Sequence, residues 1–352
     1  MALKEPWLAV NISMFFPGTG QLYAGKTLKG IGFVSAEVIL IAIATWSIFS
    51  PTGNTVTGLG CLFAIAIIYI LNLFDAYSCV SKSLNVRVAE KIPRTNKDPW
   101  FAVFLSRILP GLGQLYIEKA IAGAFLLSSI ILCSSLAGIF SHLVIIIPII
   151  SAVACYHAFV SFPKSPTKKR PLITIFAAFV LASGLFTNYL PSWVQQNIEL
   201  FEIPSKSMLP TLQVGDKIFV HKSSSYSPQQ GDVVVFKTPE AARILQSEAD
   251  KQDEQFFIKR VIGKPGQVVR IADGVVYIDN NPLQEAYITE SPAYDWGPMM
   301  VPAESYFVMG DNRNNSFDSH IWGFLPTYYL VGQAYKVFWP PARIQSLITA
   351  SH

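Results

Sequence analysis

The stretch FFIKRVIGKPGQVVRIADGVVYIDNNPL, residues 256–283, decides the fold class of the second half of the chain. Its short runs rich in valine and isoleucine are separated by glycine, proline, asparagine and aspartate, which is the pattern of strands joined by turns. Three further runs of this kind lie on either side: DKIFVHK (216–222), DVVVFKT (232–238) and SYFVMGD (305–311). Residues 193–352 are therefore predicted to form a mainly β domain.

The first half of the chain has a different texture. Hydrophobic residues make up 51% of the 352 residues and charged residues only 14%, against roughly 25% charged in an ordinary soluble domain. A helix that spans a bilayer needs about 20 mostly apolar residues. Five stretches meet this requirement: 28–49, 58–78, 120–140, 143–162 and 172–189. The sequence predicts a membrane region with four spans over 1–170 and a fifth transmembrane helix over 171–192, and it excludes a purely soluble or disordered protein.

The distribution of charge predicts an orientation in the membrane. Residues 1–170 carry 14 basic and 6 acidic side chains, a net charge of +8, whereas residues 171–352 carry 13 and 17, a net charge of −4. The basic side chains of the first half gather in three clusters, and the two loops between these clusters have none. Because Lys and Arg favour cytoplasmic loops, five spans place the C-terminal domain on the opposite side of the membrane, facing the periplasm or the cell exterior.

The membrane half also contains an internal repeat. KEPWLAVNISMFFPGTGQLYAGKTLKG, residues 4–30, matches KDPWFAVFLSRILPGLGQLYIEKAIAG, residues 97–123, at a constant offset. Each copy reads as a short apolar segment, a PGxGQLY turn and a two-helix hairpin. The repeat contains no recognisable catalytic group, so it favours a role in packing and membrane insertion over a binding site.

A first candidate for chemistry is the serine pair in FEIPSKSMLPTLQVGD, residues 201–216. Prolines hold this segment extended, because the residue before a proline is disfavoured from the helical region. Alternate side chains of an extended segment point to the same side, so Ser205 and Ser207 are expected to face the same way. Taken alone, a serine in such a loop is more often a turn residue than a nucleophile.

Lys259 is the second candidate. It lies in an apolar strand pattern and shares a strand face with Phe257 and Val261. Burial favours the neutral amine, and lowering its pKa from about 10.4 to about 7–8 would make it a general base at neutral pH. The alternative is a lysine at the sheet edge whose stem covers apolar surface. Arg260, the next residue along the strand, would point to the other face.

A third segment, VMGDNRNNSFDSHIWGFLP (308–326), is dense in Asp, Asn and Ser between two apolar anchors. It is either a set of turns or a loop that supports a site through hydrogen bonds. Taken together, the polar half resembles bacterial type I signal peptidase, the membrane-bound serine protease that removes signal peptides from exported proteins. The resemblance covers roughly 172–340 and rests on PSxSMxPTLxxGD, GDxVVF, IKRVxGxPG and MGDNRxNSxDS, which occur in the order of that family.

The resemblance implies a role for each residue of these motifs. Ser207 would be the nucleophile and Lys259 the general base, and the Ser205 hydroxyl with the Ser207 backbone N–H would form the oxyanion hole. Ser316 would orient the Lys259 amine. The residues expected to brace the surrounding loops are Asp311, Asp318 and Arg260. Those expected to line shallow apolar pockets for small side chains are Ile203, Pro204, Met208, Leu212 and Ile258.

The expected function is therefore a membrane-bound serine endopeptidase that removes N-terminal signal peptides from exported preproteins at small-x-small junctions. Small pockets select such junctions because a larger side chain would clash. The resemblance implies a location in the bacterial cytoplasmic membrane, with signal peptides and the lipid bilayer as partners. No metal, cofactor or nucleic acid is expected, because the chain has no phosphate-cradling glycine-rich loop or zinc-type Cys/His cluster, and the C-terminal half is net negative.

Two features depart from the family pattern. His320 stands where the family usually has an arginine; it could still pair with Asp318, but its charge would vary near neutral pH. The family commonly has one or two spans, whereas this sequence predicts five and a duplication. The sequence leaves open whether the additional spans serve assembly or substrate delivery.

Three alternatives compete with the peptidase. A Ser–His–Asp hydrolase could use His221, His320 or His352, but no GxSxG motif is present. An autoproteolytic repressor would use a similar Ser–Lys pair, but it would need a DNA-binding domain in place of the membrane half. A catalytically silent membrane scaffold with an exported β domain would not need both Ser207 and Lys259 in intact motifs.

Overall fold

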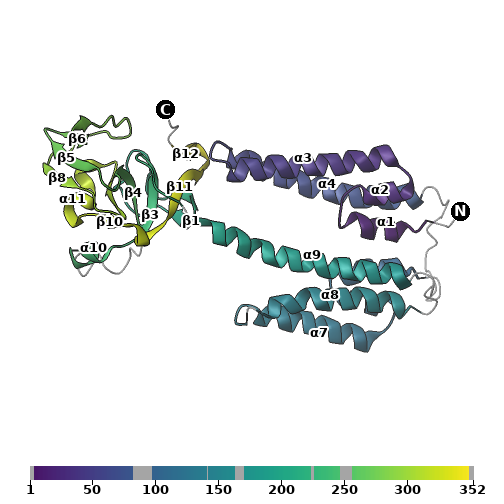
Figure 1. Ribbon diagram of the computed structural model, residues 1–352. Coiled ribbons are helices and arrows are strands. Elements are labelled where there is room, and N and C mark those ends of the chain that lie inside the picture. Colours follow the sequence, from purple (N-terminus) through teal and green to yellow (C-terminus); the bar gives the residue numbers. More distant parts are fainter. Residues whose placement is uncertain are drawn as a thin grey trace. The chain divides into compact units, whose positions relative to one another are not determined.

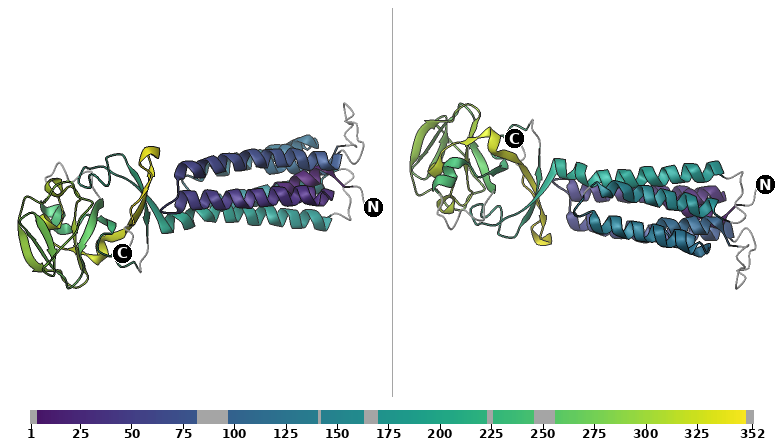
Figure 2. Two further views of the ribbon diagram at one scale, coloured as in Figure 1. Left: turned by 90° about the horizontal axis from the view of Figure 1, so that it is seen from above. Right: turned by 90° about the horizontal axis from the view of Figure 1, so that it is seen from below.

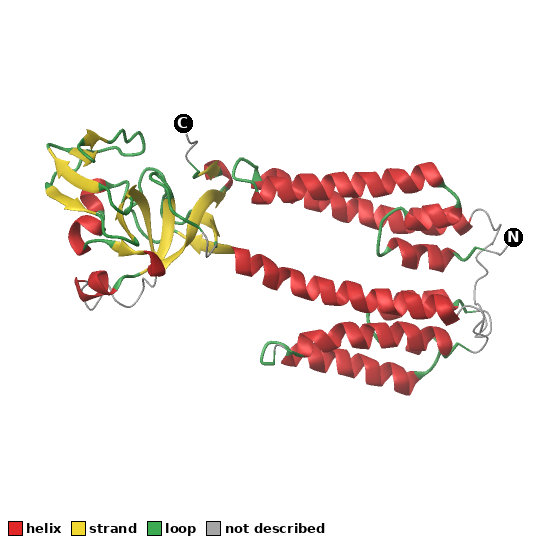
Figure 3. Ribbon diagram, viewed as in Figure 1, coloured by secondary structure: helices red, strands yellow, loops and turns green. Residues whose placement is uncertain are grey.

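The computed structural model describes residues 4–81, 97–140, 142–162, 170–222, 226–245 and 256–348. The chain divides into two compact units (Figure 1). The first comprises Met1–Ala44 and Gly60–Trp193, and the second comprises Thr45–Leu59 and Val194–His352. The first unit is helical, whereas the strands belong to the second (Figure 3). The predicted fold class, apolar membrane helices followed by a mainly β domain, is confirmed.

The helices of the first unit follow the internal repeat. The first copy contains α1 (Pro6–Ser13), α2 (Thr19–Ala24), α3 (Thr27–Phe49) and α4 (Thr55–Ser81). The second copy contains α5 (Pro99–Ile108), α6 (Leu112–Tyr116), α7 (Ala120–Leu136) and α8 (Leu143–Val160), and α9 (Arg170–Asn197) follows. Both copies therefore consist of two short helices and a hairpin of two long ones, and the long helices run alongside one another in both views of Figure 2.

The PGxGQLY turn has the same geometry in both copies. Gly18 and Gly111, at the N-caps of α2 and α6, have φ angles of +92° and +107°, which favour glycine. A Cβ on either residue would overlap the carbonyl oxygen of Gly30 or Gly123, the glycines at matching places in the two copies. The buried glutamine of each motif accepts a hydrogen bond from a serine of the preceding short helix, at 3.5 and 3.2 Å. The motif thus closes a tight contact between helices, which supports its predicted role in packing.

Within the residues that the structure describes, four helices are long and apolar enough to cross a membrane: α3, α4, α8 and α9. The predicted span 120–140 corresponds to α7, an apolar helix of 17 residues, which lies at the lower end of the range of about 17–25 for a spanning helix. Large apolar side chains such as Phe63, Phe74 and Phe125 are about 70% exposed on these helices, as expected for surfaces that face lipid. The number of five spans stays a prediction.

In its described ranges, the second unit contains two antiparallel sheets. The larger has the strand order β1-β2-β11-β3-β4-β9-β10, with β12 paired to β11, and the smaller has the order β7-β6-β5-β8. The strands of the larger sheet are β1 (Ile198–Glu202), β2 (Lys217–His221), β3 (Val233–Lys237), β4 (Phe256–Gly263), β9 (Ser305–Met309), β10 (Leu325–Pro326), β11 (Leu330–Trp339) and β12 (Gln345–Ser346). Those of the smaller sheet are β5 (Val268–Ala272), β6 (Val275–Ile278), β7 (Asn281–Pro282) and β8 (Trp296–Met300). The described part of this unit also contains two short α-helices, α10 (Glu240–Leu245) and α11 (Ser319–Trp322).

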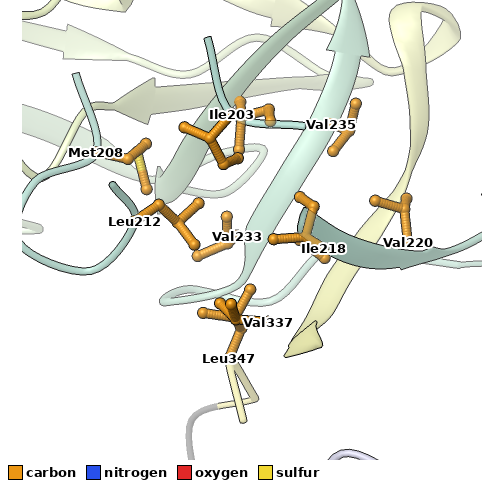
Figure 4. Packing of buried hydrophobic residues seen from close by; sticks show 11 residues of the cluster. Ile203, Met208, Leu212, Ile218, Val220, Val233, Val235, Val337 and Leu347 are labelled. Atoms are coloured by element: carbon orange, nitrogen blue, oxygen red, sulfur yellow. The ribbon is translucent and has the colours of Figure 1, made fainter. Parts of the chain in front are cut away.

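Strand β4 lies between β3 and β9, and each of its residues after the first is buried. Its side chains alternate between two cores. Ile258 joins the cluster of Figure 4, which also contains Val233 and Val235 of β3. Phe257 and Val261 belong to the cluster on the opposite face. Lys259, midway between these two residues, therefore emerges from an interior strand on the predicted face.

Candidate active site

The loop 203–216, between β1 and β2, carries the serine pair. Its two ends are joined because Ile203 N–H donates to the Asp216 carbonyl at 2.9 Å. The Asp216 carboxylate is buried and accepts a hydrogen bond from Arg343 Nε at 2.8 Å. Apolar side chains of the same loop, Met208 and Leu212, point into the core with Ile203 (Figure 4). The loop is thus anchored on both sides of Ser207.

Ser207 and Lys259 meet in the structure. Lys259 Nζ lies 2.6 Å from Ser207 Oγ. Both residues are buried: Lys259 is 4% exposed and Ser207 is 9% exposed. The alternative of a lysine at a sheet edge is wrong, because β4 is an interior strand. Burial disfavours the ammonium form relative to the neutral amine, and a neutral amine at this distance can accept the hydroxyl proton.

Ser205 lies beside this pair. Its Oγ is 3.2 Å from Ser207 Oγ, so the two hydroxyls lie side by side, as predicted. The expected extended conformation is wrong, however, because residues 207–211 form turns closed by bonds such as Leu212 N–H to the Met208 carbonyl. A hydroxyl at this position can donate a hydrogen bond to negative charge that develops on an atom bonded to Ser207 Oγ. The arrangement places two hydroxyls and an amine within one small volume, as a nucleophile, a base and a side-chain donor would require.

Arg260 and Asp311 form a buried ion pair next to the serine and lysine. Arg260 Nε and Nη2 lie 2.8 and 2.6 Å from the two carboxylate oxygens of Asp311, and both side chains are at most 5% exposed. Thr211, in the serine loop, donates to the same carboxylate. Two planar groups joined through two hydrogen bonds have a fixed mutual orientation. The pair therefore connects β4, the serine loop and the loop that follows β9.

Asp318 braces the end of the same polar loop. It is fully buried, and its carboxylate accepts hydrogen bonds from Gly310 N–H at 2.9 Å and from His320 N–H at 3.2 Å. His320 Nδ1 lies 2.7 Å from Asp318 Oδ1, the oxygen that also accepts from His320 N–H. The His320 ring stacks on Tyr294 with centroids 4.1 Å apart. His320 thus pairs with Asp318, as the sequence suggested.

Ser316 does not make its predicted bond. Its hydroxyl is buried and has no hydrogen-bond partner among the described residues, so the structure does not show it orienting the Lys259 amine. The Ser316 hydroxyl packs closely behind Ser207, against Gly310. A Cβ on Gly310 would overlap both Ser316 Oγ and the carbonyl oxygen of Ser207, and Asn312 N–H donates to that carbonyl at 3.0 Å.

Gly310→Ala is expected to lower kcat/KM by about 10²-fold, because a displacement of about 1 Å at a catalytic group can have that effect. The added methyl group must push the Ser207 carbonyl or the Ser316 side chain aside. Steady-state cleavage of a peptide measures the loss. Gly60→Ala is the matched control, since nothing lies within 4 Å of a Cβ at that position. Wild-type kcat/KM in Gly310→Ala would contradict the tight packing behind Ser207.

A small pocket of about 20 Å³ opens next to the serine and lysine, which is room for about one water. The predicted lining residues Ile203, Pro204, Met208 and Ile258 all line it. Leu212 does not; it is fully buried in the core behind the pocket, because its loop turns inward after Met208. Sequence reasoning missed two further lining residues, Phe256 and Phe257. Their position directly before Ile258 and Lys259 in the strand was the available signal.

The histidines of the polar half lie elsewhere. His221 is exposed on β2, His320 is bonded to Asp318, and His352 lies outside the described residues. Within the described ranges, the group within hydrogen-bond distance of Ser207 Oγ that can act as a base is therefore Lys259, not a histidine. No cluster of three or more His, Cys, Asp or Glu side chains suited to a metal ion occurs in the part of the chain that the structure describes.

The chain is similar to several proteins that are described as signal peptidases. A family model described as "Signal peptidase, peptidase S26" matches residues 172–339. A signal peptidase I from Leptolyngbya laminosa is 47% identical over 190 residues, which cover 52% of this chain and 88% of that protein. A probable signal peptidase I-2 from Synechocystis sp. is 42% identical over 49% of this chain and 73% of its own length. A crystal structure of a signal peptidase I from Enterococcus faecalis V583 matches 31% of this chain and 98% of that one, at 29% identity and a TM-score of 0.25.

Proposed function

Since the chain belongs to the type I signal peptidase family, a family of serine endopeptidases, we propose that it removes signal peptides from exported preproteins with Ser207 as nucleophile and Lys259 as general base. The observation that carries this proposal is the buried contact of 2.6 Å between Lys259 Nζ and Ser207 Oγ. The intact serine loop and the brace formed by Arg260 and Asp311 support it.

The reaction follows from this geometry. The neutral Lys259 amine accepts the proton of the Ser207 hydroxyl as Oγ attacks the carbonyl carbon of the scissile peptide bond. The Ser205 hydroxyl and the Ser207 backbone N–H donate to the oxyanion of the tetrahedral intermediate. As the peptide bond breaks, the Lys259 ammonium returns the proton to the leaving amine. Water then hydrolyses the acyl-enzyme, with Lys259 again as base.

The size of the pocket supports cleavage after small side chains. Apart from Ser205, Ser207 and Lys259, its walls are apolar side chains from the serine loop and from β4, and these belong to or border the packed core of the domain. Packed cores do not expand freely to accept additional atoms. An alanine side chain at the residue before the cut fits such a pocket, whereas a leucine would clash. The pocket thus supports a small residue directly before the cut. Together with the family resemblance, this leads us to propose a preference for small-x-small junctions.

The membrane half supports a location at the bilayer. Among its described helices, α3, α4 and α8, together with α9, are long and apolar enough to cross a membrane, and the positive charges of the first half favour a cytoplasmic position for its loops. With five spans, the β domain faces the periplasm or cell exterior of a bacterial cytoplasmic membrane. Helix α9 ends at Asn197 and β1 begins at the next residue. This direct connection would tether the catalytic domain to the membrane from which preproteins emerge.

A preprotein series tests both the activity and the preference. The detergent-purified full chain is expected to cleave a preprotein with an Ala-x-Ala junction and to leave the mature N-terminus directly after the last alanine. Leucine in place of this alanine should lower kcat/KM by about 10²-fold or more, as measured by mass spectrometry of the products. Leucine at the middle position is the matched control and should change the rate little. Equal cleavage of all three substrates would contradict the pocket, and no cleavage by folded wild type would favour the silent scaffold.

A further inference from the structure

The segment between β7 and β8 packs against the loop that carries Asp311 and Ser316. We call residues 285–294 the clasp. Its backbone and side chains contact the short 3-10 helix Arg313–Asn315 of the polar loop. Asn314 Oδ1 accepts a hydrogen bond from the backbone N–H of residue 293 at 2.8 Å, and Tyr294 Oη donates to the Arg313 carbonyl at 3.3 Å. The clasp therefore holds the outer side of the loop that lies behind the nucleophile.

A buried ion pair ties the clasp to this loop. Arg313 Nη1 lies 2.6 Å from Glu285 Oε2, and Nη2 contacts Oε1. The Arg313 side chain is fully buried and that of Glu285 is 5% exposed. Burial opposes the charge of Arg313, but the hydrogen bond and charge of Glu285 outweigh it and raise the Arg313 pKa. Arg313 Nε also donates to the Gly310 carbonyl at 3.2 Å, so Glu285 acts on Gly310 through a single side chain.

Tyr287 links this ion pair to the pair beside the catalytic lysine. Its hydroxyl donates to Glu285 at 2.8 Å, and the face of its ring lies 4.0 Å from the guanidinium carbon of Arg260. A guanidinium stacked on an aromatic face is attracted by the ring and loses freedom to rotate. Burial, with the neighbouring Glu285 carboxylate, raises the Tyr287 pKa, so the hydroxyl stays protonated as a donor. Tyr287 thus fixes the group that holds Asp311.

We propose that Glu285 and Tyr287 are positioning residues for the peptidase reaction: through Arg313 and Arg260 they hold residues 310–316 in the arrangement that supports Ser207. The inference rests on the proposed function. Two routes lead from the clasp to the reacting groups. One runs from Glu285 through Arg313 to Gly310, and the other from Tyr287 through Arg260 to Asp311.

Substituting both partners of the Glu285–Arg313 ion pair distinguishes this role from a general contribution to stability. A buried ion pair is weak evidence for stability, because desolvation of the two charges offsets their attraction. Removal of one partner leaves an unpaired buried charge, whereas removal of both is often nearly neutral for folding. A double substitution of Glu285 and Arg313 therefore separates folding from positioning, since it restores the balance of charge without restoring the link to Gly310.

The experiment measures kcat, KM and thermal unfolding of the full-length protein with an Ala-x-Ala peptide substrate. Glu285→Gln is expected to lower both kcat, by about 10-fold to 10²-fold, and the melting temperature. The double variant Glu285→Gln/Arg313→Met should recover most of the melting temperature while kcat stays low. Tyr287→Leu should lower kcat about tenfold with little change in KM, and Tyr287→Phe, which keeps the stacked ring, should lose less. Asp295→Asn is the matched control, because this carboxylate is exposed at the end of the same segment.

Three outcomes would overturn the inference. Recovery of kcat together with the melting temperature in the double variant would show that the clasp only stabilises the fold. Wild-type kcat in a folded Tyr287→Leu would remove the route through Arg260. If wild type itself cleaves no substrate while folded, the proposed function fails and the inference fails with it; an active wild type beside an inactive Ser207→Ala locates any failure in the clasp alone.

Discussion

Ser207→Ala is expected to lower kcat by about 10⁴-fold to 10⁶-fold, the range found when a serine hydrolase loses its nucleophile. The substitution removes one oxygen from a residue that is 9% exposed and leaves the backbone that binds Asn312 unchanged. The fold should therefore survive, and binding of the substrate should change little. Single-turnover cleavage with excess enzyme measures the remaining rate without interference from product release.

Ser227→Ala is the matched control, because it removes the same oxygen from an exposed residue in the loop before β3. It should have wild-type activity. A Ser207→Ala protein that retains a tenth of the wild-type rate would show that another group forms the covalent bond or that no covalent step occurs. Either result would remove the central residue of the proposed mechanism.

Lys259→Met should be nearly as inactive, with kcat/KM reduced by about 10⁴-fold, because Lys259 is the group placed to take the Ser207 proton. Methionine suits a position that is 4% exposed between apolar neighbours, and its side chain has no charge to desolvate. The variant should therefore be at least as stable as wild type. Thermal unfolding and peptide cleavage, measured on the same preparation, separate these two effects.

Lys237→Met, at the exposed end of β3, is the matched control and should retain activity. The double variant Ser207→Ala/Lys259→Met gives a further check. Residues that act as one unit have non-additive effects, so the double variant should be no slower than Ser207→Ala. If the fold-losses of the two single variants multiply in the double variant, Lys259 acts on a step that does not involve Ser207.

Much of the fold and of the site can be predicted from the sequence because it depends on residues close together along the chain. Strand alternation places Lys259 on the face of Phe257 and Val261, and the structure has this arrangement. The spacing of Ser205 and Ser207 predicts that their hydroxyls lie together, and they do, although the segment forms turns and not the expected extended chain. The repeat predicts two similar sets of helices, because matching glycines make the same tight approach in each copy.

The remaining features depend on contacts between distant residues. Leu212 is apolar and lies in the motif expected to line the pocket, but the turn after Met208 buries its side chain in the core. Glu285 and Tyr287 lie in a segment without periodicity, and their partners Arg313 and Arg260 are 28 and 27 residues away along the chain. No local pattern predicts such pairs, since loop path and sheet pairing together bring them into contact. Whether the Ser316 hydroxyl reaches a hydrogen-bond partner depends on its side-chain rotamer, which no sequence pattern predicts.

The most direct test of the account is the mass of the products formed from one Ala-x-Ala preprotein by four full-length proteins: wild type, Ser207→Ala, Lys259→Met and His320→Ala. We expect the mature fragment with wild type and largely with His320→Ala, whose ring contacts Asp318 and Tyr294, and no fragment with the other two. Cleavage by Lys259→Met together with its loss in His320→Ala would contradict the serine–lysine mechanism and indicate a serine–histidine hydrolase.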